Sequence, residues 1–252
     1  MTCERARQDR STELDPRIMR VAERILPRFL LRRLDPIRAI IDSEIRHLAS
    51  QTGESQIVLD AGAGEARHRA YFPRGRYVAV DSGTGDPGWD YSRLDVCGNL
   101  ECLPLLPQSV DAILCIVVLE HTRHPREVLC EFARVLKPGG ACILVVPFLW
   151  EEHQAPHDYF RFTRYGMETL FGGLPFHLEV LDPMGGFFWV CARRSVSLLS
   201  FFQSGWRRLL FPILAPVFGL LLPLLLYSLD GLDHSRHFTL GFRIRALRTD
   251  KP

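Results

Sequence analysis

The segment from Ile57 to Ala66 places the strongest constraint on the fold of this chain. Ile57-Val58-Leu59 is a short apolar run that predicts a buried parallel strand. Asp60 ends the run, and Ala61-Gly62-Ala63-Gly64 brings two glycines at alternate positions before a segment that can form a helix. Glycines at such a turn let a ligand approach the bare backbone beside the strand. The segment therefore predicts an α/β fold with a ligand at the end of this strand.

The residue at position 67 indicates which class of cofactor the glycine turn would bind. A dinucleotide fingerprint needs a third glycine where this chain has Arg67, which argues against NAD or FAD. A generic turn between a strand and a helix is the alternative. The pattern Asp60-x-Gly62-x-Gly64 resembles motif I of the class I S-adenosylmethionine (SAM)-dependent methyltransferases, although Ala66 stands where that family often has a further glycine. The resemblance implies that four residues of the turn bind SAM: Asp60, Ala61, Gly62 and Gly64.

The downstream spacing agrees with this resemblance. Tyr77-Val78-Ala79-Val80 predicts a second strand, and it ends in Asp81, 21 residues after the acid of the glycine turn. A carboxylate at this place can accept hydrogen bonds from both ribose hydroxyls, and a carboxylate that caps the next turn is the alternative. The resemblance implies that Asp81 binds the ribose. Residues 92–96 predict a third strand, whose last two residues, Asp95 and Val96, would contact the adenine by the same resemblance.

Two more stretches carry the resemblance. Residues 111–118 are nearly all apolar and predict a fourth strand buried on both faces. They lead into Leu119-Glu120-His121, which resembles the "LEH" signature of the methyltransferase-11-like branch, and Lys137-Pro138-Gly139-Gly140 resembles the "LKPGG" turn before a fifth strand at 142–147. Together the motifs cover residues 56–147 and imply that Glu120 contributes to cofactor binding.

The segment after the fifth predicted strand holds the candidates for handling the methyl acceptor. It reads His153-Gln154-Ala155-Pro156-His157-Asp158-Tyr159-Phe160-Arg161-Phe162-Thr163 and resembles a segment of methyltransferases associated with glycan and cell-surface pathways. Ligands of open α/β sheets lie at this edge, and imidazole is suited to proton removal near neutral pH. Structural hydrogen bonding is the alternative role for the histidines. Four residues are catalytic candidates: His121, His153, His157 and Tyr159.

The sequence does not favour a metal site or a nucleic-acid partner. His153 and His157 are four residues apart, but Pro156 lies between them and Asp158 is the only neighbouring third ligand, so we expect no metal. The seven cysteines are scattered without a C-x-x-C pair and read as small buried hydrophobes in a reducing compartment. The formal charge of +2 gives no field that would attract nucleic acid.

Helical segments flank and interrupt the predicted domain. Residues 17–34 predict an amphipathic helix with a series of arginines, and residues 35–49 predict a second helix, so residues 1–50 would form an N-terminal helical cap. The methyltransferase domain would span 51–252, with a Rossmann-like, mostly parallel sheet whose last strand, 238–247, is antiparallel. A hydrophobic insertion at about 184–235 would precede that strand. The remaining predicted elements are helices at 66–71, 125–136 and 165–171 and a strand at 176–181.

The insertion contains 19 residues without a charge, 209–227, which approach the length of a membrane span. Three prolines interrupt this stretch, and a chain that returns to the sheet cannot cross the membrane once. Arg193 and Arg194 interrupt a second span at 187–202. A re-entrant element, an interfacial element and a lid buried by a partner subunit are the alternatives. We favour peripheral membrane contact through 196–229, with the arginine helix as a second contact.

The combined interpretation is a methyltransferase that uses SAM and acts on a small-molecule, lipid or glycan-type acceptor at a membrane surface. We expect a cytoplasmic protein that is peripheral at the inner membrane face. The alternative is a non-catalytic SAM-fold scaffold at the membrane that binds little or no cofactor. The residues leave the acceptor atom, the general base and the oligomeric state open.

Overall fold

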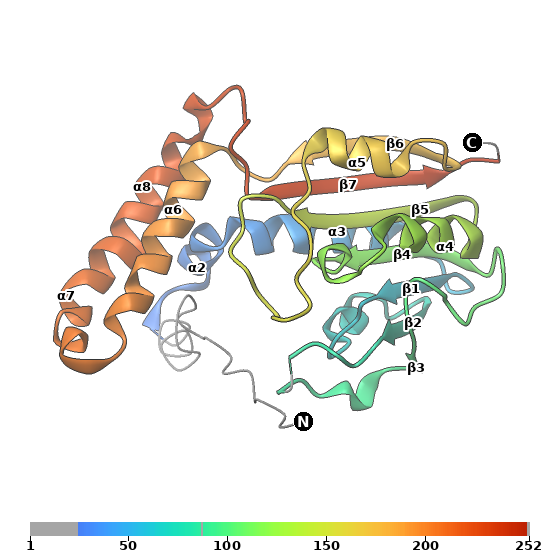
Figure 1. Ribbon diagram of the computed structural model, residues 1–252, viewed down its shortest axis with the longest axis horizontal. Helices are drawn as coiled ribbons and strands as arrows, with labels where there is room; N and C mark the ends of the chain where they lie inside the picture. The colour runs from blue at the N-terminus through green and yellow to red at the C-terminus, as the bar shows by residue number, and fades with distance from the viewer. Residues whose placement is uncertain (1–24, 87, 251–252) are drawn as a thin grey trace, which may run out of the picture. The chain divides into compact units, whose positions relative to one another are not determined.

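The computed structural model describes residues 25–86 and 88–250, and the chain divides into two compact units (Figure 1). The first, which we call the sheet unit, comprises Ile40–Met184 and Gly241–Pro252. The second, the helical unit, comprises Met1–Ala39 and Gly185–Leu240. The insertion expected at about 184–235 therefore lies within the helical unit, whereas all the strands lie in the sheet unit.

A seven-stranded sheet forms the centre of the sheet unit, in the order β3-β2-β1-β4-β5-β7-β6. The pairs from β3 to β5 are parallel, and β7 is antiparallel to both of its neighbours. This arrangement confirms the predicted Rossmann-like fold, including the antiparallel last strand. The strands are β1 (Ile57–Ala61), β2 (Arg76–Asp81), β3 (Val96–Cys97), β4 (Val110–Ile116), β5 (Leu136–Pro147), β6 (Phe176–Pro183) and β7 (Gly241–Arg248).

Helices cover both faces of this sheet, because successive strand residues point to opposite faces. Leu59 belongs to a core cluster that also contains Phe132 of α4, whereas its neighbour Val58 belongs to a second cluster with Ile45 of α3. The central strands are thus buried on both sides, as their apolar composition predicts. The helices of this layer structure are α3 (Pro36–Gln51), α4 (Pro125–Val135) and α5 (Arg164–Phe171).

Three predicted elements of the sheet unit differ from the structure. The helix expected at 66–71 is a five-residue 3-10 helix, η2 (Arg67–Tyr71), because Ala66 adopts a left-handed φ of 53° and Phe72 ends the turn. The third strand is reduced to β3, because residues 91–93 form a 3-10 turn capped by the Asp90 side chain. β5 begins at Leu136, so the predicted Lys137–Gly140 turn forms the irregular first part of that strand.

The helical unit is built around a hairpin of two antiparallel helical segments (Figure 1). Its first arm is α6 (Phe187–Leu198), and its second arm ends in α8 (Leu222–Leu229), which packs beside α6. The second arm is π-helical at Val217–Leu221, directly after Pro216, which lacks the N–H of a regular turn. The other segments are α2 (Arg28–Leu34), η5 (Leu199–Phe202), η6 (Gly205–Leu209), α7 (Phe211–Pro216), η7 (Val217–Leu221) and η8 (Asp230–Leu232).

Two aspartates that follow the second arm cap the first arm. The Asp230 carboxylate accepts a hydrogen bond from the Gly186 N–H at 3.0 Å, and the Asp233 carboxylate accepts one from the Phe187 N–H at 2.8 Å. Acidic groups at a helix N-terminus satisfy free N–H groups and oppose the helix dipole, which stabilises the hairpin. The Tyr227 hydroxyl of α8 donates to the Leu34 carbonyl at the end of α2, so α2 joins the hairpin. Residues 17–24 of the predicted arginine helix lie outside the described residues.

Candidate active site

The glycine turn after β1 is held against the end of β2. The Gly62 N–H donates to the Val80 carbonyl at 2.8 Å, and the Gly64 N–H donates to the Asp81 carboxylate at 2.9 Å. Gly62 has a φ of 83°, and a Cβ built on it would lie 2.3 Å from the Val118 side chain. Glycine is therefore required at Gly62 by the backbone conformation and by the close approach of Val118. Ala61 is the last residue of β1 and is fully buried.

The two acids of this region lie at the same edge of the sheet but have different surroundings. Asp60 is 1% exposed, and its carboxylate accepts hydrogen bonds from the Tyr77 hydroxyl and from His68 Nδ1. Asp81 is half-buried at the end of β2, and its second oxygen accepts from the Gly83 N–H at 2.8 Å. Asp60 therefore holds the turn from inside the protein, whereas Asp81 is the acid that solvent and ligands can reach.

The environment of Asp60 shifts the titration of both neighbours. Burial raises the pKa of Tyr77, and the adjacent Asp60 carboxylate raises it further. Burial lowers the pKa of His68, but the hydrogen bond and charge of Asp60 outweigh this effect and raise it overall. Asp60 therefore keeps the imidazole of His68 partly cationic at a higher pH than usual.

The loop after β2 places an aromatic wall over the glycine turn. A Cβ built on Gly64 would lie 3.0 Å from the Trp89 ring, and the same ring lies 3.0 Å from a Cβ built on Gly85. The Trp89 and Tyr91 rings are 6.2 Å apart. The sequence shows this loop as rich in glycine, aspartate and proline, and its tryptophan is the residue that could have indicated an aromatic wall at the site.

Asp95, the predicted adenine contact, already has protein partners. Its carboxylate accepts from the Ala79 N–H at 2.8 Å and from the Arg69 guanidinium at 2.7 Å. Burial raises the pKa of Asp95, but these two donors outweigh it and hold the pKa below the usual value. Val96 follows as the first residue of β3. Asp95 thus joins β2 to the segment that leads into the short third strand.

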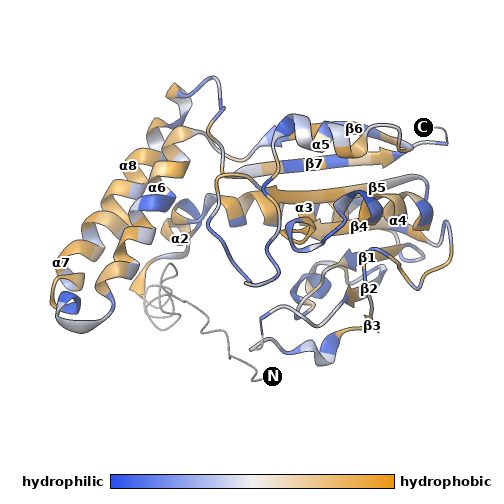
Figure 2. Cartoon of the chain, viewed as in Figure 1, coloured by the Kyte–Doolittle hydropathy of each residue, from blue (hydrophilic) through white to orange (hydrophobic). Residues whose placement is uncertain are grey.

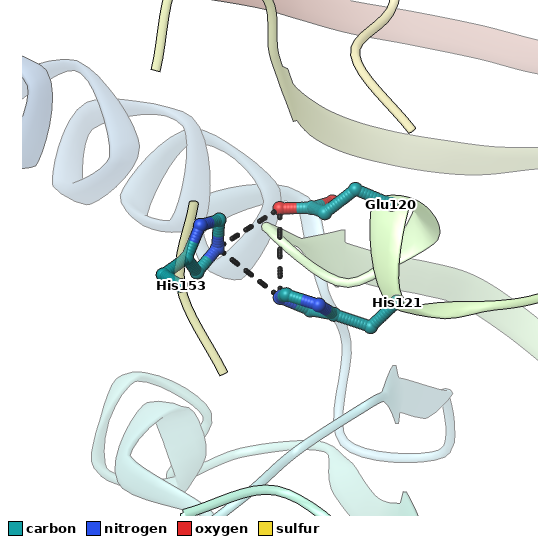
Figure 3. Close-up of side chains that lie close together, drawn as sticks. All are labelled: Glu120, His121 and His153. Atoms are coloured by element: carbon teal, nitrogen blue, oxygen red, sulfur yellow. Dashed lines mark hydrogen bonds and ion pairs between the residues drawn. The ribbon is translucent and has the colours of Figure 1, made fainter. Parts of the chain in front are cut away.

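Glu120, His121 and His153 come together at the carboxyl ends of β4 and β5 (Figure 3). The His121 and His153 Nε2 atoms are 3.1 Å apart. Glu120 Oε1 lies 3.5 Å from His153 Nε2 and 3.8 Å from His121 Nε2. Glu120 is fully buried, and both imidazoles are 12% exposed. We call these three residues the Glu-His-His cluster.

A strained turn brings Glu120 and His121 to this position. The Val117 backbone has a φ of 57°, an outlier for a β-branched residue. Its N–H donates to the Val145 carbonyl at 2.8 Å, so the β4–β5 ladder holds the residue in this conformation. Such strain is typical of functional sites, where the surrounding structure compensates its cost.

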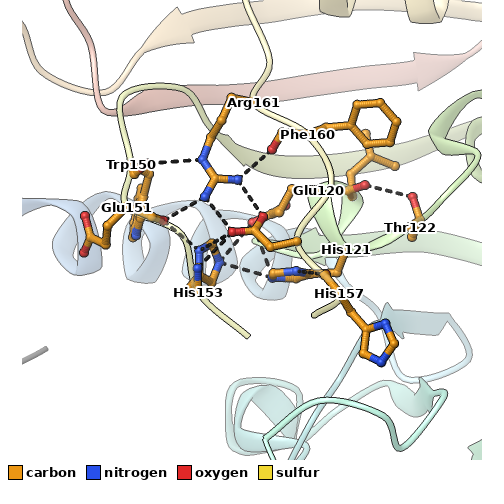
Figure 4. A network of polar contacts seen from close by, with 11 residues as sticks. Glu120, His121, Thr122, Trp150, Glu151, His153, His157, Phe160 and Arg161 are labelled. Carbon is orange, nitrogen blue, oxygen red and sulfur yellow. Dashed lines mark hydrogen bonds and ion pairs between the residues drawn. The ribbon is translucent and has the colours of Figure 1, made fainter. Parts of the chain in front are cut away.

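Arg161 folds the loop after β5 around His153 (Figure 4). Both terminal nitrogens of its guanidinium lie 2.6 Å from the Asp158 carboxylate oxygens, and it also donates to the carbonyls of Trp150 and Glu151. Asp158 in turn accepts from the His153 N–H at 2.9 Å. Two parallel hydrogen bonds from a guanidinium to a carboxylate fix geometry well. Arg161 and Asp158 therefore position His153.

The remaining predicted residues form a second, adjacent pair. His157 Nδ1 and the Tyr159 hydroxyl are 2.9 Å apart, and the Tyr159 N–H donates to the Glu120 carbonyl at 2.9 Å. The Arg123 guanidinium lies over the Tyr159 ring, 5.2 Å from the ring centroid. The four catalytic candidates are thus neighbours, but His153 meets His121 and not His157.

Sequence reasoning missed the residues that support these groups. Their types gave a partial signal, since buried tyrosine and paired aspartate and arginine usually serve as hydrogen-bond partners. Their partners, however, lie in segments that are distant in the chain or folded irregularly. The missed residues are His68, Tyr77, Trp89, Asp158 and Arg161.

The chain matches known methyltransferases in sequence. Residues 59–144 match the family described as "Methyltransferase domain" (Methyltransf_11). The human thiol S-methyltransferase TMT1B is 27% identical over 143 residues, which are 52% of this chain and 56% of that protein. The rat protein of the same name is 28% identical over 137 residues, 46% of this chain and 53% of that protein. The chain thus spans about half the length of the curated relatives that it matches.

Solved structures agree in fold at low sequence identity. A chain from the complex of the Haloferax volcanii Trm112 methyltransferase activator with its methyltransferase partner is 18% identical, with a TM-score of 0.52 over 87% of this chain and 95% of that one. Geranyl diphosphate C-methyltransferase from Streptomyces coelicolor A3(2), a complex that contains S-adenosyl-L-homocysteine, is 12% identical with a TM-score of 0.50 over 96% and 90%. Residues 59–144 thus match the methyltransferase family, and the chain shares the fold of these solved structures.

Proposed function

We propose that this chain is a SAM-dependent methyltransferase that acts on an amphiphilic small-molecule or lipid-like acceptor at a membrane surface, and that the Glu-His-His cluster handles the acceptor. The observation that carries this proposal is the buried carboxylate beside two imidazoles at the carboxyl edge of the sheet. Ligands of open α/β sheets bind at that edge. Polar groups converging in a buried place are suited to orienting one reactive atom of a substrate.

The residues of the glycine turn fit the cofactor. Gly62 and Gly64 offer backbone without side chains, and Asp81 offers a reachable carboxylate at the end of the next strand. We propose that Asp81 accepts hydrogen bonds from the ribose, that Ala61 and the glycines line the methionine side, and that Asp60 supports the turn. Asp95 with Val96 would border the adenine, and Glu120 would lie between the cofactor and the acceptor.

The proposed reaction is a displacement at the methyl carbon. SAM supplies a methyl group on a sulfonium, and the acceptor's heteroatom forms a bond to that carbon as the sulfur–carbon bond breaks. S-adenosylhomocysteine leaves, and the proton of the acceptor passes to a nearby base or to solvent. The protein's own part is to align the acceptor and exclude water. We propose His121, His153, His157 and Tyr159 for these tasks.

A thiol is a second candidate acceptor. The curated relatives human and rat TMT1B are named thiol S-methyltransferases, and the match to each covers about half of either chain. A thiol has an ordinary pKa of about 8.5, so modest stabilisation of the thiolate is sufficient near neutral pH. An imidazole of the buried cluster is suited to accept the proton of such a thiol.

The proposed membrane contact is supported by an apolar stripe on the helical unit. Ile213, Val217, Leu221 and Leu225 are four residues apart and between 44% and 68% exposed. Residues at this spacing share one face of a helix. Phe211–Leu232 is the one helix among the described residues that is long and apolar enough to cross a membrane. Figure 2 shows the hydrophobic colour along α7 and α8. Exposed apolar surface of this extent marks an interaction site.

The ends of the stripe also fit a lipid interface. Trp206 is 74% exposed just before Arg207 and Arg208, a combination suited to the headgroup level of a bilayer. α2, which is part of the same unit, follows Ile25 and contains Phe29, and both are largely exposed. We propose that the hairpin lies in the interface with its apolar stripe in the lipid, which would place the protein as a peripheral component at the inner membrane face.

Methyl transfer from radiolabelled SAM tests the acceptor proposal. The panel should contain small thiols, lipid extracts and lipid-linked glycans, with wild-type protein, His153→Asn and the exposed control His124→Asn. We expect a labelled product in the thiol or lipid arms for wild type and His124→Asn, and at least about 10-fold less for His153→Asn with unchanged SAM affinity. Equal product from His153→Asn would show that the cluster does not handle the acceptor, and no product although SAM binds would argue for the non-catalytic scaffold.

Flotation on anionic liposomes tests the membrane proposal. The full chain is compared with a deletion of 196–232 and with a full-length variant that carries Ile213→Asn, Leu221→Asn and Leu225→Asn. A control variant replaces exposed polar residues on the sheet unit, Glu168→Gln and Arg164→Gln. We expect the wild type and the control to float and the other two proteins to stay in solution. Equal flotation of all four proteins would refute the proposal.

A further inference from the structure

The Glu-His-His cluster presents three lone pairs to one point. His121 Nδ1 lies 2.7 Å from the His157 carbonyl, and His153 Nδ1 lies 3.1 Å from the Glu151 carbonyl. A carbonyl oxygen only accepts hydrogen bonds, so each Nδ1 carries the proton of its neutral ring. Each Nε2 is then unprotonated, and the two Nε2 atoms face each other at 3.1 Å beside Glu120 Oε1. The lone pairs of these three atoms repel one another unless a cation lies between them.

Glu120 gives an independent indication of a missing cation. The residue is fully buried, and neither of its carboxylate oxygens has a hydrogen-bond partner among the described residues. The nearby Arg161 guanidinium is already engaged by both oxygens of Asp158. A buried carboxylate without a partner is unfavourable, and a charged hydrogen bond or a bond to a metal ion would recover that cost.

The distances within the cluster suit a metal ion. Two ligands held about 2.0–2.1 Å from a zinc ion in tetrahedral directions lie about 3.3–3.4 Å apart. The three ligand atoms here are separated by 3.1, 3.5 and 3.8 Å. Metal-bound histidines usually donate their other ring N–H to a carbonyl or carboxylate, and both imidazoles already do so. Two histidines and one glutamate also form a known ligand set of zinc sites with an open position.

We propose that Glu120, His121 and His153 form a binding site for a divalent transition metal, with Zn²⁺ as the preferred ion and one coordination position left open. This differs from the expectation of no metal, which weighed His153 with His157 and Asp158. If the proposed function holds, the open position would bind the sulfur or oxygen of the acceptor. The cluster would then act on the acceptor through the metal, and His157 with Tyr159 would remain to accept its proton.

A second group of residues that could bind a metal differs from the Glu-His-His cluster, because its carboxylate already accepts hydrogen bonds from the protein. Glu101, His124 and Glu127 also lie close together, but they are half-buried or exposed. The Glu101 carboxylate accepts from the N–H groups of Arg123 and His124 and from the His124 ring. Its lone pairs are thus used by donors of the protein. This group is the matched control for the Glu-His-His cluster.

Direct metal binding by the full-length protein tests the proposal without any assay of activity. Wild-type protein is dialysed against a chelator and titrated with Zn²⁺ by calorimetry, and Co²⁺ is used as a coloured substitute whose absorption reports a four-coordinate site. We expect one ion per chain for wild type and for His124→Asn. Each of the variants His121→Asn, His153→Asn and Glu120→Gln removes one metal ligand. Loss of a hydrogen-bond partner of a metal-bound histidine typically lowers metal affinity by roughly 10- to 100-fold. We expect these variants to lower the Zn²⁺ affinity by more than that.

Two further measurements separate this proposal from other failures. Circular dichroism and SAM affinity show whether each variant is folded, and X-ray absorption on the zinc-loaded wild type counts imidazole ligands without any variant. Two imidazoles and one oxygen ligand would support the site. No Zn²⁺ uptake by the chelator-treated wild-type protein, or equal uptake by the His121 and His153 variants, would overturn the proposal. A proton shared between the two imidazoles would then explain their close approach. SAM binding would persist in that case, so the proposed methyltransferase function would stand.

Discussion

At the scale of single residues, Asp60 and Asp81 have different surroundings and therefore different proposed roles. Asp60 is enclosed by Tyr77 and His68, whereas Asp81 contacts the turn and stays half-exposed. The sequence places both acids at strand ends and assigns both to the cofactor by resemblance. The structure adds that one of them is a buried hydrogen-bond acceptor for its own neighbours. We propose that its contribution to cofactor binding is to hold the turn in shape.

The ion pair between His68 and Asp60 predicts a pH-dependent stability. The folded-state pKa of His68 lies above its ordinary value of 6.5, so the pair stabilises the fold fully below that pH and less as the pH rises through the folded-state pKa. We expect His68→Gln to lower the free energy of unfolding by about 1 kcal/mol or more at pH 5.5 and by less at pH 8.5. Urea unfolding at both pH values measures this, with the exposed His177→Gln as control. An equal loss at both values would contradict the assignment.

Gly62→Ala tests the close approach of Val118. The added methyl group meets Val118 at 2.3 Å and must also adopt a φ of 83°. We expect a loss of about 1–3 kcal/mol in the free energy of unfolding and weaker SAM binding. Gly83→Ala is the matched control, because Gly83 has a φ of 71° but nothing within 4 Å of an added Cβ. Calorimetry of unfolding should show a larger loss for Gly62→Ala, and equal losses would mean that only the backbone strain matters.

At the scale of elements, the loop after β5 decides how the candidate site is assembled. The sequence identifies its histidines, but it does not predict that His153 meets His121, 32 residues earlier in the chain. That contact depends on the Arg161–Asp158 pair and on the strained turn at Val117, and neither follows a periodic pattern. By contrast, β1, β4, α3 and α4 follow clear hydrophobic patterns, and the structure confirms them. Regular elements are therefore predictable here, whereas the irregular loops that complete the site are not.

The hydrogen bonds of Arg161 give a prediction for this loop. Arg161→Ala removes both hydrogen bonds to Asp158 and those to the carbonyls of Trp150 and Glu151. We expect a loss of about 1.5–3 kcal/mol in stability and a lower kcat for methyl transfer, with unchanged SAM affinity, because His153 loses its support. The exposed Arg164→Ala at the start of α5 is the control. An unchanged kcat in Arg161→Ala would show that the loop geometry does not control the reaction.

At the scale of the whole molecule, the two units carry separate proposed tasks. The sheet unit carries the glycine turn, Asp81 and the Glu-His-His cluster, and the helical unit carries the apolar stripe. The sequence indicates the stripe by composition, and the structure adds that the stripe belongs to a capped helical hairpin with α2 packed against it. The sequence did not predict this pairing, because the two arginines on α6 made the first arm unfavourable as a membrane span.

Calorimetric titration with SAM tests the central claim that the glycine turn and Asp81 at the end of β2 bind the methyl donor. We predict one SAM per chain for wild type and for the exposed control Glu168→Ala. Asp81→Ala should lose about 1.5–3 kcal/mol of binding free energy, a 10- to 100-fold weaker affinity, because the ribose hydroxyls lose a charged acceptor. Full affinity in Asp81→Ala, or no binding by the folded wild type, would contradict the claim.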